Sequence, residues 1–230
     1  MSLLADERNA RQSPARQSVR TALAATLALT LAAASWIVAG SRMAGMDMGV
    51  ATELGSFASF MLLWIVMMAA MMLPGAVPAM LRRAGFGGRM RAAPLFVATY
   101  LAVWGVVGIA VYPMYRPHGT VVVGIVAVIV AAYELTPLKR RFRTLCHDGV
   151  CNGFAFGVYC IGSSIGLMVL LLLLGLMNIV WMAVVAAIVL AQKLLPAKAA
   201  IDVPVALAIV GLGILILIAP AALPGLMPTM

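Results

Sequence analysis

The sequence predicts an all-α fold, a polytopic transmembrane helical bundle of about seven spans, with the N-terminus cytoplasmic and the C-terminus outside. Composition is the first reason, because 64% of the 230 residues are hydrophobic and only 10% are charged. A soluble domain carries about 25% charged residues. The second reason is that the apolar residues form long runs, and a helix needs about 20 of them to cross a bilayer.

Seven apolar runs approach this length, and each is expected to form one span. The runs cover residues 19–41, 56–80, 93–115, 119–137, 154–177, 179–195 and 201–220. They define a single transmembrane domain over 19–220. A basic cytoplasmic segment precedes it at 1–18, and a short extracytoplasmic tail follows at 221–230.

The first run also resembles a signal peptide. A basic leader precedes it, and Ala32-Ala33-Ala34-Ser35 has the small residues of a cleavage site. The apolar core of a signal peptide usually has about 7–15 residues, and this one is longer, which favours a retained membrane anchor. Cleavage of residues 1–34 would leave the sidedness of every later loop unchanged.

Prolines and glycines interrupt two later runs. Pro74, Gly75 and Pro78 lie in the second run, where a proline removes a backbone donor and frees a carbonyl. Such a bend lines a path or a site in some membrane proteins and serves packing in others, and the sequence leaves both open. In the fifth run, Gly157 and Gly162 suit the close approach of another helix.

The basic residues predict the topology. All sixteen Lys and Arg residues except Arg42 and Arg116 lie in the N-terminal segment or around the loops after the second, fourth and sixth runs. The positive-inside rule places these loops in the cytoplasm. Because the net charge of +9 is divided among short loops, it indicates contact with lipid headgroups, and no nucleic-acid partner is expected.

The second run carries methionines at helical spacing within Trp64-Ile-Val-Met-Met-Ala-Ala-Met-Met-Leu-Pro-Gly-Ala-Val-Pro-Ala-Met80. We call four of them the methionine stripe: Met67 and Met71 on one face, Met68 and Met72 on another. Met61 lies nearer the outside, and Met168 in the fifth run is expected at a similar depth. Thioethers favour Cu(I), but methionine also fills ordinary cores, so a metal pathway and simple packing are both open.

A second group of methionines follows the first run. Met43, Met46 and Met48 surround Asp47 in a short polar loop on the outer side. Thioethers in an exposed loop are hard to explain as core, which predicts a capture site for Cu(I). The alternative is that these flexible apolar side chains dip into the membrane interface.

All three cysteines lie at the cytoplasmic end. Cys146 and Cys151 are expected in the loop after the fourth run, and Cys160 is in the fifth run. A disulfide is not expected to persist in the cytoplasm, so these residues predict thiolates available to Cu(I). With His147 and Asp148 they would instead form a zinc-like set, and cysteines without a ligand role are the third alternative.

Few ionisable groups lie near membrane depth. Glu134 and Asp202 are the acidic ones, and each is expected to pair with Lys139, Lys193 or Lys198, although Glu134 could instead relay a proton or hold a cation. Only two histidines exist, on opposite sides of the membrane. A haem site, a multi-histidine site or a serine hydrolase is therefore not expected, and we expect no enzyme.

Three motifs carry a resemblance to a known family. The methionine-stripe run, Tyr133-Glu-Leu-Thr-Pro-Leu-Lys139, and Gly175-Leu-Met-Asn-Ile-Val-Trp-Met182 with Gln192-Lys-Leu-Leu-Pro196 together resemble the bacterial family described as predicted metal-binding integral membrane proteins, sometimes labelled copper chaperone. The resemblance covers residues 43–197. It implies a polytopic bundle, multi-pass in the bacterial cytoplasmic membrane, that associates with a soft metal.

The chain departs from the typical pattern of that family twice. Cys160-Ile-Gly-Ser-Ser-Ile165 stands where typical members carry Cys-x-Gly-Cys-Cys-Trp, so that one thiol of three is kept. Typical members also carry Gln at the position of Glu134 and Glu at that of Gln192. This exchange of acid and amide would be compensatory if the two positions touch.

The sequence therefore predicts a copper-handling membrane protein. Cu(I), with zinc the less favoured metal, would pass from the outer methionine loop along the methionine stripe to the cysteines. Its purpose would be transport or delivery to a membrane metalloenzyme. The alternative is a non-catalytic structural or assembly subunit whose methionines pack against partner helices.

Overall fold

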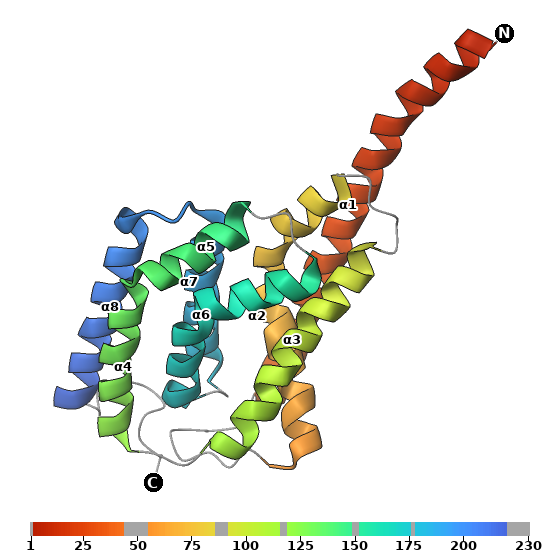
Figure 1. Ribbon diagram of the computed structural model, residues 1–230. Helices are drawn as coiled ribbons and strands as arrows, with labels where there is room; N and C mark the ends of the chain where they lie inside the picture. Colours follow the sequence, from red (N-terminus) through yellow and green to blue (C-terminus); the bar gives the residue numbers. More distant parts are fainter. Residues whose placement is uncertain are drawn as a thin grey trace.

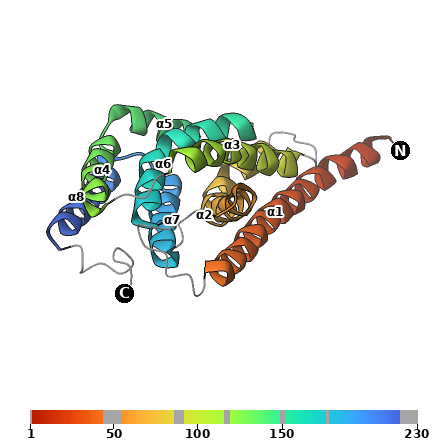
Figure 2. The same ribbon diagram turned by 90° about the horizontal axis from the view of Figure 1, so that it is seen from below.

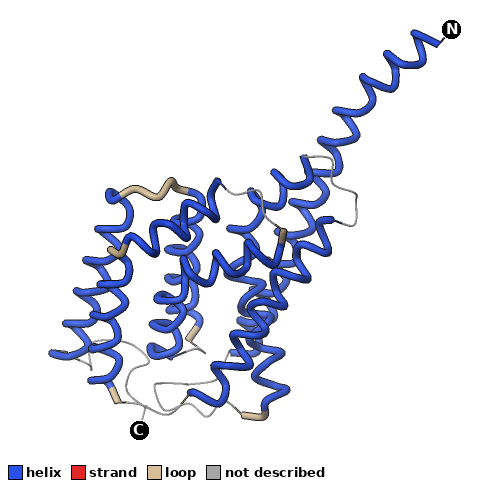
Figure 3. Tube along the Cα trace, viewed as in Figure 1, coloured by secondary structure: helices blue, strands red, loops and turns tan. Residues whose placement is uncertain are grey.

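The computed structural model describes residues 2–43, 55–85, 92–115, 119–148, 152–175 and 178–219. Over these ranges the chain is helical apart from short connections, and Figure 3 shows no strand in them. The helices of the described ranges are α1 (Ser2–Met43), α2 (Phe57–Gly85), α3 (Ala92–Met114), α4 (Thr120–Glu134), α5 (Pro137–Asp148), α6 (Gly153–Gly175), α7 (Ile179–Leu194) and α8 (Ala199–Ile218). The predicted all-α class is confirmed.

Seven of these helices coincide with the seven apolar runs, but not all of the seven are long enough to cross a membrane. Five contain segments long and apolar enough to cross a membrane: Ala22–Met43, Phe57–Leu81, Ala93–Met114, Gly153–Gly175 and Ala199–Ile218. The other two, α4 and α7, are apolar but have only 15 and 16 residues. At 1.5 Å per residue, each falls short of the roughly 30 Å of a bilayer core.

The helices form two groups joined in the middle. In one group α2 packs against α1 and α3, and in the other α4 packs against α8. Helices α6 and α7 connect the groups, because α6 contacts α3 and α4 while α7 contacts α2 and α8. Figures 1 and 2 show this order, with α1 and α8 at opposite edges.

Helix α5 was not predicted, because its residues were assigned to a loop after the fourth run. It begins directly after α4, at a bend of 63°. Thr136 explains the restart, since its hydroxyl accepts a hydrogen bond of 3.3 Å from the backbone N–H of Lys139 and so caps the new helix. Pro137 follows at the first helical position, where its missing N–H costs nothing.

Helix α2 continues through Pro74 and Pro78, so the expected interruption is absent from it. Pro74 has no N–H to donate to the carbonyl of Ala70, four residues earlier. The indole Nε1 of Trp36 on α1 donates to that carbonyl instead, at 3.0 Å. This contact supplies the lost hydrogen bond and fixes α1 against α2.

Candidate metal site

The methionine stripe faces the interior of the bundle. Met67, Met68 and Met72 are 0% exposed and Met71 is 2% exposed. Their helix packs against α1, α3 and α7, which cover the stripe and separate it from lipid. Met168 on α6 is also buried, but α6 and α2 do not pack closely against each other. Met168 was expected only at a similar depth to the stripe, and its place in a metal site stays a prediction.

The outer methionine loop is only partly described. Met43 is the last residue of α1 and is 5% exposed, so it belongs to the core and not to an exposed loop as expected. The helix reaches Met43 because no helix-breaking residue precedes it after the apolar run. Met46, Asp47 and Met48 lie outside the described residues, and their role stays a prediction.

Side chains from four helices meet at Lys193, near the C-terminal end of α7. Its Nζ donates to the Tyr100 hydroxyl at 3.2 Å and approaches the Met72 Sδ at 3.5 Å. The same hydroxyl lies 3.1 Å from the Cys160 Sγ, which is fully buried. These contacts connect the C-terminal half of the methionine stripe to one of the predicted thiols through Lys193 and Tyr100.

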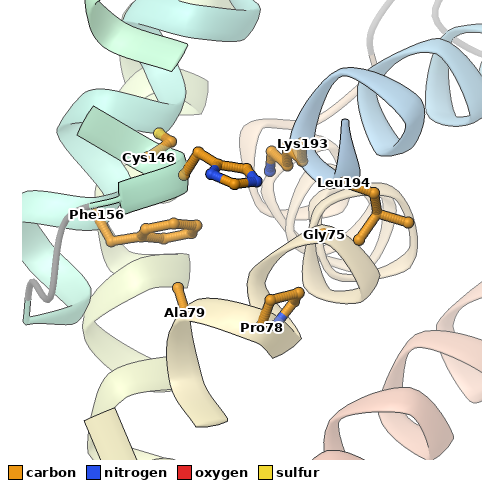
Figure 4. Close-up of a pocket in the computed structure, with 8 residues that line it drawn as sticks. Gly75, Pro78, Ala79, Cys146, Phe156, Lys193 and Leu194 are labelled. Carbon is orange, nitrogen blue, oxygen red and sulfur yellow. The ribbon is translucent and has the colours of Figure 1, made fainter. Parts of the chain in front are cut away.

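Lys193 reaches this position because of Gly75. The lysine stem passes directly over Gly75, where a Cβ atom would lie 3.3 Å from the Lys193 Cβ and 3.4 Å from its Cγ. The ammonium then lies 5.7 Å from the centre of the Tyr100 ring and 5.9 Å from that of Phe156, within range of cation–π attraction. Figure 4 shows Lys193 extending from α7 towards α5 and α6, beside Gly75 and Pro78.

Cys146 lies near the end of α5, where it is 7% exposed. A cavity of about 50 Å³ separates α2 from α5 and α7 at this point, lined by Gly75, Pro78, Ala79, Cys146, His147, Phe156, Lys193 and Leu194. A smaller cavity of about 10 Å³ is lined by Arg143, Cys146, Ser163, Ser164, Val189, Gln192 and Lys193. Cys146 and Lys193 line both cavities.

The smaller cavity also leads towards Cys160. The hydroxyl of Ser164 lies 4.0 Å from the Cys160 Sγ, and Ser164 lines this cavity together with Cys146. Both cysteines are thiols. We call Met72, Tyr100, Cys146, Cys160 and Lys193 the sulfur cluster.

The sulfur cluster fits some metals better than others. No three His, Cys, Asp or Glu side chains among the described residues form a group that could hold a metal ion. The donors present are thiols and a thioether, which suit Cu(I). Cys151 and the side chain of Asp148 lie outside the described part of the chain, so the zinc-like set with Cys146 and His147 stays a prediction.

Two buried ion pairs lie beside the sulfur cluster. Glu134 pairs with Lys139, as expected, and Gln192 bonds both partners: its Nε2 donates to the carboxylate at 2.8 Å and its Oε1 accepts from Lys139 at 3.1 Å. Asp202 pairs with Arg143 and lies 3.8 Å from Arg140, so its expected lysine partners were wrong. Arg143 was available because it lies on the unpredicted helix α5.

One protein family matches the part of the chain that holds this arrangement. A family model described as copper chaperone, PpoB2, matches residues 61–216, which is more than half of the chain. The chain belongs to the PpoB2 copper chaperone family. The predicted resemblance is thereby confirmed, whereas no curated protein and no solved structure matches the chain.

The region matched by the copper chaperone family contains the whole methionine stripe, the sulfur cluster and both buried ion pairs. Met43, Met46 and Met48 precede it. Sequence reasoning missed Tyr100 and the place of Lys193 in the cluster. Lys193 lies at the end of an apolar run, where spacing alone does not distinguish a lysine that turns into the bundle from one at the membrane interface.

Proposed function

We propose that this copper chaperone family member binds Cu(I) as its cargo through the thiolates of Cys146 and Cys160 and the thioether of Met72. The carrying observation is that Lys193 contacts the Met72 thioether, reaches the Cys160 thiol through Tyr100, and lines two small cavities together with Cys146. Thiolate and thioether ligands select Cu(I) among the common metals. The family description supports the same metal.

We further propose that the methionine stripe supplies the path to this site from the outside. Its side chains are buried and span six residues of α2, from Met67 to Met72, or about 7.5 Å along the axis. Neutral thioethers bind Cu(I) more weakly than thiolates, so that affinity rises towards the cysteines. With the cysteines on the cytoplasmic side of a bacterial inner membrane, this order suits inward transport or delivery to a membrane metalloenzyme, without a catalytic step.

The alternative, a structural or assembly subunit, needs methionines that pack against a partner's helices. The stripe is covered by this chain's own α1, α3 and α7, which leaves no thioether of the stripe available to a partner. The apolar side chains that are exposed, such as Leu207 on α8, suit lipid or a partner equally. The burial of the stripe therefore argues against methionines that pack on a partner's helices.

The test measures Cu(I) bound by the full-length protein in detergent, by elemental analysis and by competition with a chromogenic Cu(I) chelator. We expect the wild type to retain Cu(I) and the double variant Cys146→Ser/Cys160→Ser to lose it. Met72→Leu should weaken binding, because it keeps the side-chain volume and removes only the sulfur. The matched control is Met182→Leu, at a buried methionine near the opposite end of α7.

Two results would contradict the proposal. The first is a wild-type protein that carries no Cu(I) after purification from copper-fed cells and binds none from the chelator. The second is a double cysteine variant that binds Cu(I) as tightly as the wild type. In either case the buried methionines would be core packing, and the structural alternative would take the place of the copper function.

A further inference from the structure

We propose that Lys193 is the counter-charge of the copper site and makes the site selective for a monovalent ion over a divalent one. This inference rests on the proposed function, because it assumes that Cys146 and Cys160 bind the metal. It adds Lys193, which is not a ligand, to the site. It proposes that the charge of this residue determines the preference for Cu(I) over Zn(II).

The first observation is the charge balance at this end of the bundle. Lys139 and Arg143 are buried, and each forms an ion pair with a carboxylate, Glu134 or Asp202. Lys193 is half-buried, and no carboxylate of the described residues lies within 4.0 Å of its ammonium. A half-buried cation without an anion loses part of its hydration, so negative charge nearby would stabilise this ammonium.

The second observation is what surrounds that ammonium. Its hydrogen-bond partners are the Tyr100 phenol and the Met72 thioether, and the Phe156 ring centre lies 5.9 Å away. Through Tyr100 it reaches Cys160, and it lines both cavities with Cys146. Among the described groups near Lys193, the thiols of Cys146 and Cys160 are the ones that coordinate a soft metal as anions.

Binding of metal changes the charge of these thiols in a defined way. Cysteine coordinates as the thiolate, so each thiol loses a proton to solvent as the metal binds. Cu(I) with two thiolates carries one unit of negative charge, which the ammonium of Lys193 neutralises. Zn(II) with two thiolates is already neutral, and Lys193 then adds an uncompensated positive charge. In a poorly hydrated site this difference favours Cu(I).

A competing role for Lys193, as an occupant of the metal site, predicts the opposite change in Cu(I) affinity. An ammonium 3.5 Å from a thioether sulfur could instead occupy the place of the incoming ion and be displaced by it. Removal of the lysine would then strengthen Cu(I) binding, whereas removal of a counter-charge weakens it. The sign of one affinity change therefore decides between the two roles.

The experiment compares full-length wild type with Lys193→Leu and Lys193→Arg in detergent, using competition with a Cu(I) chelator and, separately, with a Zn(II) chelator. Leucine removes the charge without adding a thioether ligand. Lys198→Leu is the control, because Lys198 is exposed. Loss of a group that supports metal ligands typically lowers affinity about 10–100-fold. We expect Lys193→Leu to lose Cu(I) affinity by this factor while its Zn(II) affinity is unchanged or higher. Lys193→Arg should recover most of the preference for Cu(I).

The outcomes distinguish this inference from the proposed function. If Lys193→Leu binds Cu(I) as tightly as the wild type, or more tightly, the counter-charge role is wrong, while loss of binding in the double cysteine variant still supports copper handling. An equal loss of both metals in Lys193→Leu would assign a purely structural role to Lys193 and would also overturn the inference. A wild type without Cu(I) binding overturns the proposed function itself.

Discussion

Gln192 Nε2 donates a hydrogen bond of 2.8 Å to Glu134 Oε2, although the two residues are 58 positions apart, on α7 and α4. Lys139 contacts both of them, because it pairs with the carboxylate and donates to the Gln192 Oε1 at 3.1 Å. An acid and an amide at these two positions thus bind one buried cation together. An exchange of acid and amide between the two positions, as the family resemblance indicates, keeps one carboxylate and one amide beside Lys139.

This contact predicts that the exchange can be repeated in the laboratory. Glu134→Gln leaves Lys139 without its carboxylate, and breaking a buried pair in this way costs about 3–5 kcal/mol. In Glu134→Gln/Gln192→Glu the carboxylate moves to the other side of the same ammonium, so most of the stability should return. Thermal unfolding of the full-length protein in detergent measures both. A double variant no more stable than Glu134→Gln would contradict the prediction.

The sequence predicts much of the fold from local patterns. The lengths of the apolar runs place the helices, and the pairing of Glu134 with Lys139 follows from their separation by a single turn region. The basic residues after Glu134 suggested a loop, and the Thr136-Pro137 pair, which starts a helix, was the signal that corrects it. Helix length is thus predictable, whereas a bend between two short helices depends on capping.

The candidate site was predictable only in part. The spacing of the methionines places them on α2, but their burial depends on α1, α3 and α7, which no local pattern positions. Lys193 and Tyr100 are 93 positions apart, and their contact arises from tertiary packing. The absence of a side chain at Gly75 is what admits the lysine, whereas the local sequence indicates that glycine only as part of a helix break.

The Trp36 indole predicts a second stability effect. Trp36→Phe removes the donor to the Ala70 carbonyl, and an unsatisfied buried acceptor costs about 1–3 kcal/mol. In a Pro74→Ala background the new backbone N–H can donate to the same carbonyl, so the substitution at position 36 should cost less. The unfolding temperatures of the four proteins measure this coupling.

A matched control exists for the tryptophan substitution. The buried indole nitrogen of Trp181 has no hydrogen-bond partner in the described part of the chain, so Trp181→Phe removes ring volume without removing a hydrogen bond. It should lower stability less than Trp36→Phe. An equal cost of Trp36→Phe with and without Pro74 would show that its packing, and not its hydrogen bond, stabilises α2.

Arg143 predicts a difference between two cations of the same charge. Its guanidinium pairs with Asp202, and its Nε and Nη2 donate to the Gln192 carbonyl at 3.2 and 2.7 Å, where α7 ends. Lysine keeps the charge but lacks the forked donors. Arg143→Lys should therefore lower stability by about 1–3 kcal/mol, the cost of leaving these acceptors unsatisfied. Arg141→Lys, at an exposed position of the same helix, should leave stability unchanged. An equal loss of stability at both positions would show that the forked donors of Arg143 do not stabilise the protein.

Gly75 predicts that the position of Lys193 can be changed without altering Lys193 itself. A methyl group at Gly75 would occupy the path of the lysine stem, so Gly75→Ala should move the ammonium away from Tyr100 and Met72. The variant should then shift metal preference from Cu(I) towards Zn(II), as is expected of Lys193→Leu, in the same chelator competitions. Gly211→Ala is the control, because no side chain lies within 4 Å of the added methyl group there. If Gly75→Ala keeps the wild-type preference while its structure shows the lysine displaced, the charge of Lys193 does not act through its position beside the sulfur cluster.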